Sequence, residues 1–392
     1  MQEASGQPAG LQERLESHGV TRRDFLKYCA SIAALLGLSE SAAPQVAAAL
    51  EKAGSLKPVV WMEFGSCSGC TESLAQSDYP DVASIVLDIL SVNYSETLMA
   101  GAGWTALEAL ESTIEAGGYL LVCEGAVMTG WDSGALMIGG KKATDDLAHA
   151  AEKAEAVIAV GACAVDGGFV SQHPNPAGGT GVQAFLDSRG IDKPVINIPC
   201  CPMNPEWLVA VVVDYLLLGA LPPLVERKHT DGTVLKYPKF IAGQTIHDNC
   251  PRRGHFENGE FVTQFGSKEE AMGYCLYKVG CKGPQTFALC PVTRWNRSAS
   301  WCVESGAPCI GCASMDWVDN NSPFLKRMSD TRIGDTFVQP GTIGAAVGAV
   351  AAAGLVVHGI GMKAAGRIGD GPPMEEMKAY DRKRLAKKGG DK

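Results

Sequence analysis

Seven cysteines lie between residues 250 and 312 of this 392-residue chain, and they constrain its fold more than any other feature of the sequence. The chain has fourteen cysteines in all and is 46% hydrophobic, so it can bury a large core without disulfide bonds to hold it together. Cysteines gathered in this way therefore indicate metal binding or redox chemistry. The formal net charge of -9 argues against the basic surface that nucleic-acid binding requires.

The middle of the chain has the pattern of an α/β domain. Short, continuous apolar runs alternate with helical patterns, which predicts a parallel sheet covered by helices on both faces. From about Pro222 the alternation stops and Gly, Pro, Asn and Cys dominate, so a second, irregular domain shaped around its ligands is expected up to about Asn321. The expected strands are residues 58–62, 119–122, 156–160 and 195–198, and the expected helices are residues 143–153 and 206–218.

Cysteines follow three of these strands at their carboxyl ends. Cys67 and Cys70 come after the first strand, Cys163 after the third and Cys201 after the fourth. The carboxyl ends of parallel strands meet at one edge of the sheet, where open α/β folds bind their ligands. Four thiolates are the usual ligands of a [4Fe–4S] cluster, so these cysteines predict one at that edge. The alternatives are four buried, inert thiols or, for the C-x-x-C pair alone, a zinc or thioredoxin-like site.

The second domain offers two further sets of metal ligands. One imidazole and three thiols come first, and four thiols follow. Thiolate and imidazole suit both zinc and iron–sulfur clusters, so two structural zinc sites remain an alternative. A disulfide framework is disfavoured, because a C-x-x-C pair would close a very tight ring. The first set is His247, Cys250, Cys275 and Cys281, and the second set is Cys290, Cys302, Cys309 and Cys312.

The N-terminal segment, residues 1–49, has the pattern of a twin-arginine export signal. Arg22 and Arg23 precede an apolar run over residues 28–38, and small residues lead to a predicted cleavage point near Ala49. This route exports folded proteins, which suits clusters that are inserted in the cytoplasm. The alternative is a chance Arg-Arg pair ahead of a short amphipathic helix.

Residues 342–362 contain no Asp, Glu, Lys or Arg and predict a transmembrane helix. At about 1.5 Å rise per residue, a helix of this length spans a hydrocarbon core of roughly 30 Å. The tail, residues 363–392, is rich in Lys and Arg, so the positive-inside rule places it in the cytoplasm and the main body on the periplasmic side. The alternative is a buried, Ala- and Gly-rich helix of a soluble protein.

Five motifs, in this order along the chain, resemble the small subunit of nickel–iron hydrogenases over about residues 58–321. The motifs are CSGCTES (residues 67–73), GACA (161–164), PCCPMNP (199–205), GCKGP (280–284) and PCIGC (308–312).

The resemblance implies a flavodoxin-like domain, here residues 50–221, with a proximal [4Fe–4S] cluster on the four strand-end cysteines. It implies that residues 222–321 hold a distal [4Fe–4S] cluster on the His247 set and a medial cluster on Cys290, Cys309 and Cys312. A linker, residues 322–341, would then lead to the membrane helix. The nickel–iron site would lie in a separate large subunit, so no catalytic residue is expected in this chain.

Two positions depart from the pattern of this family. Many members have a proline where this chain has Cys302, together with a medial [3Fe–4S] cluster. A fourth thiolate here favours a medial [4Fe–4S] cluster, as in the selenium-containing relatives. Cys200 stands where glycine is usual, and the sequence assigns it no role. Gly69 and Gly168 occupy the two places where oxygen-tolerant members carry extra cysteines, so an ordinary proximal cluster is expected.

The function implied by the resemblance is electron transfer during hydrogen oxidation. Electrons would pass from the large subunit through three clusters to a membrane cytochrome b or another quinone-linked acceptor. The related quinone-reductase subunit of respiratory complex I is a weaker match, because it should lack the cysteine-rich domain. A zinc-stabilised exported binding protein and a stand-alone iron–sulfur electron carrier are the remaining alternatives.

Overall fold

The computed structural model describes residues 16, 21–36, 38–52, 57–77, 90–218, 221–296, 298–325, 332–333, 336–337, 340–365, 378–379 and 382–383. The chain divides into two compact units, Met1–Arg327 and Met328–Lys392.

Five parallel strands form the central sheet of the first unit, in the spatial order β2-β1-β3-β7-β9. Numbered by chain order within the sheet, this is the 2-1-3-4-5 arrangement of flavodoxin-like folds, and it confirms the predicted α/β class. Four of the strands match the predicted runs. The edge strand β2 was not predicted, because Ser91, Asn93 and Ser95 interrupt its apolar pattern. The strands are β1 (Pro58–Glu63), β2 (Ser91–Ser95), β3 (Leu120–Glu124), β7 (Ala156–Val160) and β9 (Val195–Ile198).

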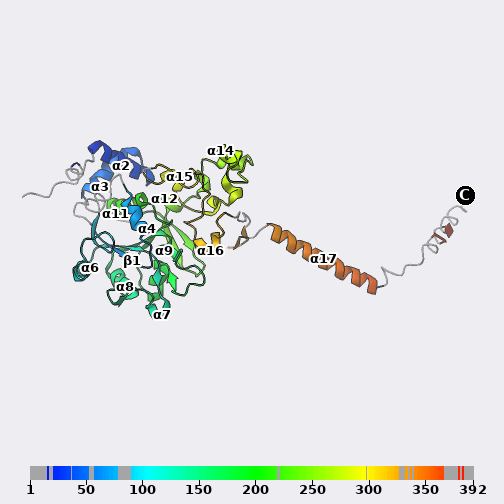
Figure 1. Ribbon diagram of the computed structural model, residues 1–392, viewed down its shortest axis with the longest axis horizontal. Coiled ribbons are helices and arrows are strands. Elements are labelled where there is room, and N and C mark those ends of the chain that lie inside the picture. Colours follow the sequence, from blue (N-terminus) through cyan, green and yellow to red (C-terminus); the bar gives the residue numbers. More distant parts are fainter. Residues whose placement is uncertain are drawn as a thin grey trace, which may run out of the picture. The chain divides into compact units, whose positions relative to one another are not determined.

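Successive residues of the central strands enter two different cores. In β1, Val59 and Trp61 face one side of the sheet while Val60 and Met62 face the other, as expected for a strand buried on both faces. Helices cover both cores (Figure 1). The first core takes side chains from α2 (Arg22–Leu35), α3 (Ala43–Lys52), α4 (Gly69–Ala75) and α11 (Pro205–Leu218), and the second from α6 (Trp104–Ala116), α8 (Ala143–Lys153) and α10 (Val182–Arg189).

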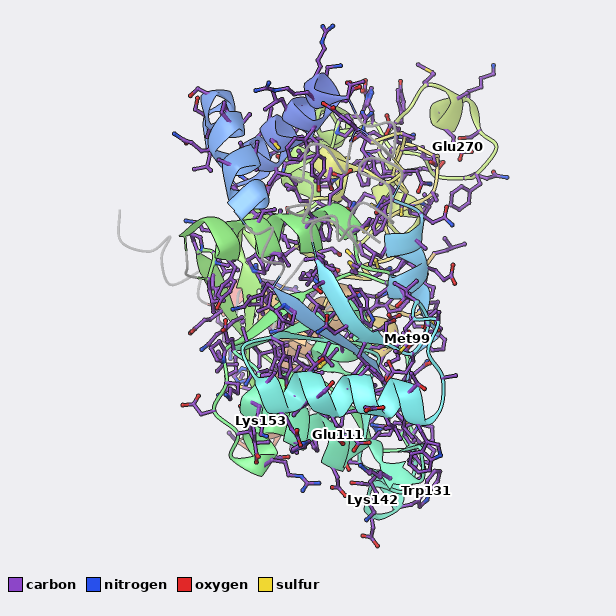
Figure 2. The ribbon with its side chains drawn as sticks, turned by 90° about the vertical axis from the view of Figure 1, so that its left-hand side faces the viewer. Met99, Glu111, Trp131, Lys142, Lys153 and Glu270 are labelled. Atoms are coloured by element: carbon purple, nitrogen blue, oxygen red, sulfur yellow. The ribbon has the colours of Figure 1, made fainter. Side chains whose placement is uncertain are left out.

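The second core lies under helix α6, which crosses the sheet on the viewer's side of Figure 2. Trp131 and Lys142 lie beyond this helix, at the opposite end of the view from Glu270. The short elements in this part of the chain are β4 (Val127–Met128), α7 (Gly130–Ser133), β5 (Met137–Ile138), β6 (Lys141–Lys142), α9 (Gly161–Asp166) and β8 (Gly179–Thr180).

The predicted export signal contains a helix that packs into the first core. Thr21 caps α2 by accepting a hydrogen bond from the Asp24 N–H, and Phe25, Tyr28 and Ile32 of this helix are buried in the same cluster as α11. A short 3₁₀ helix, η1 (Glu40–Ala42), leads into α3. The predicted cleavage point near Ala49 lies inside α3, so this helix has to unwind before cleavage there. The boundaries of the signal stay a prediction.

After the sheet, the chain forms one hairpin and then mostly short helices and loops. The hairpin of β10 (Leu224–Lys228) and β11 (Val234–Pro238) was not predicted. The remaining elements are α12 (Lys239–Ala242), η3 (His247–Asn249), α13 (Arg253–Glu257), α14 (Lys268–Ala271), η4 (Leu276–Val279), η5 (Gly283–Gln285), α15 (Cys290–Thr293) and α16 (Trp317–Asn321). Ile246, Leu276 and Trp301 nevertheless join the first core, so this irregular region packs directly on the sheet domain.

The second unit contains one long helix among the residues described. Helix α17 runs from Pro340 to Ala364, and its 21 residues Gly344–Ala364 are long and apolar enough to cross a membrane. This agrees with the span expected at residues 342–362. Before it, β12 (Arg332–Ile333) pairs with β13 (Thr336–Phe337). Most of the predicted cytoplasmic tail lies outside the described residues.

Candidate metal centres

The four strand-end cysteines come together at the carboxyl edge of the sheet. Cys67 and Cys70 flank the start of α4, Cys163 lies in α9 after β7, and Cys201 follows β9. Cys201 lies close enough to Cys163 and Cys67 for their charges to raise its pKa. Cys70 is affected in the same way by Cys201 and Cys163. The first predicted set of ligands is therefore one spatial group, which we call the proximal group.

Glycine keeps the space beside these thiols open. Gly161 has a φ of +82°, and a Cβ at this position would lie 2.4 Å from Cys70 Sγ. A Cβ at Gly69 would lie 3.0 Å from Cys67 Sγ. Any larger residue would press on a thiol at either place. Glycine at these two places therefore lets the thiols of Cys70 and Cys67 lie directly against the backbone.

Backbone groups lie close to the sulfurs of the proximal group. The Met203 N–H donates to Cys70 Sγ at 3.4 Å. The backbone of Phe169 and Val170 lies close to Cys163 and opposes the rise that burial causes in the pKa of its thiol. Such hydrogen bonds stabilise negative charge on ligand sulfurs and tune the potential of a bound cluster.

One buried carboxylate fixes the C-x-x-C loop to the sheet. Glu124, the last residue of β3, is 2% exposed. It accepts hydrogen bonds from the backbone N–H groups of Cys70 and Thr71, at 2.9 and 3.0 Å, from the Thr71 hydroxyl at 2.6 Å and from the Trp61 indole at 3.2 Å. Burial raises the pKa of Glu124, and these hydrogen bonds oppose that rise. The carboxylate satisfies the free N–H groups at the start of α4 and so positions Cys70.

The second predicted set lines one pocket. His247, Cys250, Cys275 and Cys281 share it with apolar side chains that include Ile246, Leu276 and Val303. In the described part of the chain, no three His, Cys, Asp or Glu side chains are drawn together closely enough to hold a single metal ion. A cluster of several irons needs its ligands further apart than one ion does. We call these four residues the distal group.

The third predicted set lies next to the distal group. Cys302 and Cys309 both lie close enough to Cys312 and Cys290 for the charges of those two thiols to raise their pKa. Glycine is again favoured, because Gly311 has a φ of +83° and a Cβ there would lie 2.6 Å from Asn321 Nδ2. We call Cys290, Cys302, Cys309 and Cys312 the medial group.

Direct contacts join the three groups in the order proximal, medial, distal. The Cys201 N–H of the proximal group donates to the Cys312 thiol of the medial group. The Cys309 N–H of the medial group donates to the Cys281 thiol of the distal group, and the adjacent Lys282 N–H donates to the Cys309 carbonyl at 2.7 Å. Three thiol-rich sites in a row could pass electrons from one end to the other.

Two family models match this chain, and both fit the arrangement. Residues 67–215 match the NADH ubiquinone oxidoreductase 20 kDa subunit, and residues 243–325 match the C-terminal part of the NiFe/NiFeSe hydrogenase small subunit. The small chain of the quinone-reactive Ni/Fe-hydrogenase of Wolinella succinogenes is 38% identical over 88% of this chain and 97% of its own length. The chain belongs to the family of nickel–iron hydrogenase small subunits.

Other members of this family match this chain over nearly all of their own length. Small subunit 1 of the periplasmic [NiFe] hydrogenase of Nitratidesulfovibrio vulgaris is 41% identical over 81% of this chain and 96% of its own. A solved structure of the [NiFeSe] hydrogenase of Desulfomicrobium baculatum aligns with a TM-score of 0.62 at 32% identity, over 69% of this chain and 99% of that chain. As a hydrogenase small subunit, the protein carries iron–sulfur clusters, transfers electrons and pairs with a large subunit.

Burial keeps several thiols of this small subunit protonated in the absence of metal. It raises the pKa of Cys70 and Cys309 well above the usual range and that of Cys275 to about 11. Only the thiolate is a good ligand, so the positive charge of bound iron must displace these protons. Cluster insertion is therefore expected to release protons.

Sequence reasoning missed two residues of the site. Glu124 ends an apolar strand, and a lone charge in that place was a usable signal. Cys200 was noted but given no role, and the structure places its thiol 4.0 Å from that of Cys290. No sequence pattern shows that contact, because the two residues are 90 positions apart.

Proposed function

We propose that this hydrogenase small subunit holds its clusters on the three groups defined above. The proximal group, Cys67, Cys70, Cys163 and Cys201, would bind a [4Fe–4S] cluster. The distal group, His247, Cys250, Cys275 and Cys281, would bind a second. The observation that carries the assignment is that each predicted ligand set forms one spatial group and that neighbouring groups touch. Bound iron–sulfur clusters supply one-electron carriers, and the chain supplies thiolates, N–H donors and a cover against water.

The division of labour between the subunits gives the first test. This chain has no proposed acid/base or nickel site, so hydrogen is split in the large subunit. The mature chain alone should show iron–sulfur absorption but no hydrogen-dependent dye reduction, whereas the heterodimer should show both. Nickel-dependent turnover by the isolated chain would overturn the assignment.

The medial group supports a [4Fe–4S] cluster, with Cys302 as fourth ligand beside Cys290, Cys309 and Cys312. Cys302 is exposed, as are the proposed ligands Cys67 and Cys201, so its thiol is free to meet a bound group. Exchange of Cys302 for proline should convert the cluster to [3Fe–4S] and give an oxidised-state EPR signal that the parent lacks. A stoichiometric three-iron signal already present in the oxidised parent would show that Cys302 is not a ligand.

Electrons are proposed to leave through the distal group to a quinone-linked acceptor in the membrane, such as a cytochrome b. Two observations support this: the Wolinella relative is called quinone-reactive, and α17 is long and apolar enough to cross a membrane. A chain that stops after Phe337 should form an active heterodimer that is released from the membrane. A chain that stops after Ala364 keeps the helix and should stay bound, which makes it the matched control.

The periplasmic side of the cytoplasmic membrane is the proposed location, reached by the twin-arginine route. Arg22 and Arg23 begin helix α2, and a relative in Nitratidesulfovibrio vulgaris is called periplasmic. Replacing both arginines by lysine keeps the charge and should hold the folded subunit in the cytoplasm. The single change Lys27→Arg, four residues further on, should leave export unchanged. Normal export of the twin-lysine variant would contradict the proposal.

A further inference from the structure

Cys200 is a buried thiol that the proposed ligand sets do not use. Its side chain is fully buried, and its Sγ lies 4.0 Å from Cys290 Sγ of the medial group. The Cys312 thiol of the same group lies near enough to interact with it electrostatically. A fifth thiol therefore contacts one of the four proposed medial ligands and lies near a second.

The backbone holds Cys200 in a conformation that favours glycine. Its φ is +86°, in the left-handed region, where a side chain costs about 1–3 kcal/mol. The Cys200 carbonyl accepts a hydrogen bond from the Ala162 N–H at 2.8 Å, which helps to keep the turn in place. The turn directs the side chains of two neighbouring residues to different places. Cys201 joins the proximal group, and the Cys200 side chain contacts the medial group.

The distance between the sulfurs decides between a ligand and a hydrogen-bond donor. Sulfur ligands on different irons of one cluster point away from its centre, so they lie further apart than two sulfurs in contact. A separation of 4.0 Å suits an S–H···S hydrogen bond instead. Cys302 remains available to complete the cluster.

We propose that the Cys200 thiol donates a hydrogen bond to the ligand sulfurs of the medial cluster, Cys290 or Cys312. This inference rests on the ligand sets proposed above. A hydrogen bond to a ligand sulfur stabilises the more negative, reduced state of a cluster and raises its potential. A fourth thiolate, Cys302, acts in the opposite direction. Cys200 thus offsets part of the lowering of the medial reduction potential that the fourth thiolate causes, and all four thiolates stay in place.

The test is a redox titration of the complete heterodimer, followed by EPR, for the parent and three variants. Cys200→Gly suits the left-handed backbone and removes the donor, and Cys200→Ala removes the donor alone. Both should lower the one-electron equilibrium constant for medial reduction by about tenfold, which corresponds to 59 mV. Cys200→Ser keeps an O–H donor and should shift it less. The proximal and distal potentials should not move.

A second measurement detects the proposed hydrogen bond directly and does not depend on redox potentials. Electron–nuclear double resonance on the reduced medial cluster of the parent should detect an exchangeable proton that is lost in Cys200→Ala. The proposal is wrong if the medial potential is the same in the parent, Gly and Ala proteins. It is also wrong if either variant loses one iron from the medial cluster, because Cys200 would then be a ligand. A parent without a medial cluster would instead refute the ligand sets themselves.

Discussion

The sheet domain and the cysteine-rich region hold their ligands by opposite means. In the sheet domain, apolar strands and helices build a core on each face, and the proximal cysteines sit at the ends of strands that this core already fixes. After the hairpin, the other region has mostly short helices and loops around its thiols. In the first case the fold positions the ligands. In the second, the proposed clusters would help to hold the fold.

Loss of one proposed distal ligand should destabilise the cysteine-rich region more than the sheet domain, and this is the largest effect that we expect. Cys275→Ser should remove several kcal/mol of local stability from residues 243–325, because ligand binding there is also folding energy. Hydrogen exchange should show fast exchange in that region and continued protection in β3, β7 and β9.

A buried thiol outside the ligand sets provides the control for that experiment. Cys123 lies in β3 and is fully buried. Cys123→Ala should cost only about 1 kcal/mol and should leave exchange in residues 243–325 unchanged. Equal loss of protection in both regions of the Cys275→Ser protein would mean that they fold as one unit, and the contrast between them would fail.

The converse experiment replaces a side chain in the core of the sheet domain and measures the loss of stability there. Trp61 is fully buried and donates its indole N–H to Glu124. Trp61→Ala should destabilise the sheet domain by about 3–5 kcal/mol, measured by denaturant unfolding of the holo protein. Trp61→Phe keeps an aromatic ring but loses the hydrogen bond and part of the packing, so it should cost less, about 1–3 kcal/mol. A loss for Phe as large as that for Ala would show that the hydrogen bond matters more than the packing.

A histidine links the hairpin to the cysteine-rich region and should make the stability of this junction depend on pH. Burial opposes the charge on His229, but hydrogen bonds with Asp316 and Asp231, at 2.8 and 2.9 Å, outweigh it and raise its pKa to about 9. The folded state therefore binds this proton more tightly than the unfolded state, whose pKa is about 6.5. Its stabilising contribution is complete below pH 6.5 and is lost as the pH rises through 9.

That contribution should amount to at most about 3 kcal/mol between these pH values. Unfolding measured from pH 6 to pH 9.5 in the parent and in His229→Gln should separate it from other groups. The Gln variant should lose less stability as the pH rises. Parallel curves for the two proteins would show that the ion pair does not contribute to the junction.

The smallest of these effects concerns the hydrogen bonds of the C-x-x-C loop. Glu124→Gln replaces one acceptor oxygen by an NH₂ group that faces the donors of Thr71 or Cys70, and it should cost about 1–3 kcal/mol. Glu72→Gln, on the exposed side of the same helix, is the matched control and should stay within about 0.5 kcal/mol. The proximal EPR signal should broaden only in the Glu124 variant.

The same contrast explains what could be predicted from the sequence. Strands β7 and β9 and helix α8 match the predicted residue ranges, because each is a continuous apolar or strongly helical run. The polar edge strand β2 and the hairpin β10–β11 lack that signal. In the cysteine-rich region the spacing predicted which thiols group together, but no periodicity describes the path of the loops between them.

Cys200 shows where the limit lies for single residues. Its neighbour Cys201 was assigned from its place after a strand, whereas the role of Cys200 depends on a backbone angle of +86°. Sequence patterns do not encode such an angle when the residue is not glycine. The contact between Cys200 and Cys290 therefore had to come from the structure.

The hydrogen bonds around the proximal group should also affect the rate of electron transfer. Glu124 locks the Cys70 and Thr71 N–H groups, and the Met203 N–H group already faces the Cys70 sulfur before any electron arrives. Dipoles that are fixed in advance do not have to reorient when the charge of the site changes. The proximal loop should thus have a small reorganisation energy, so that an electron can arrive and leave without the protein having to move.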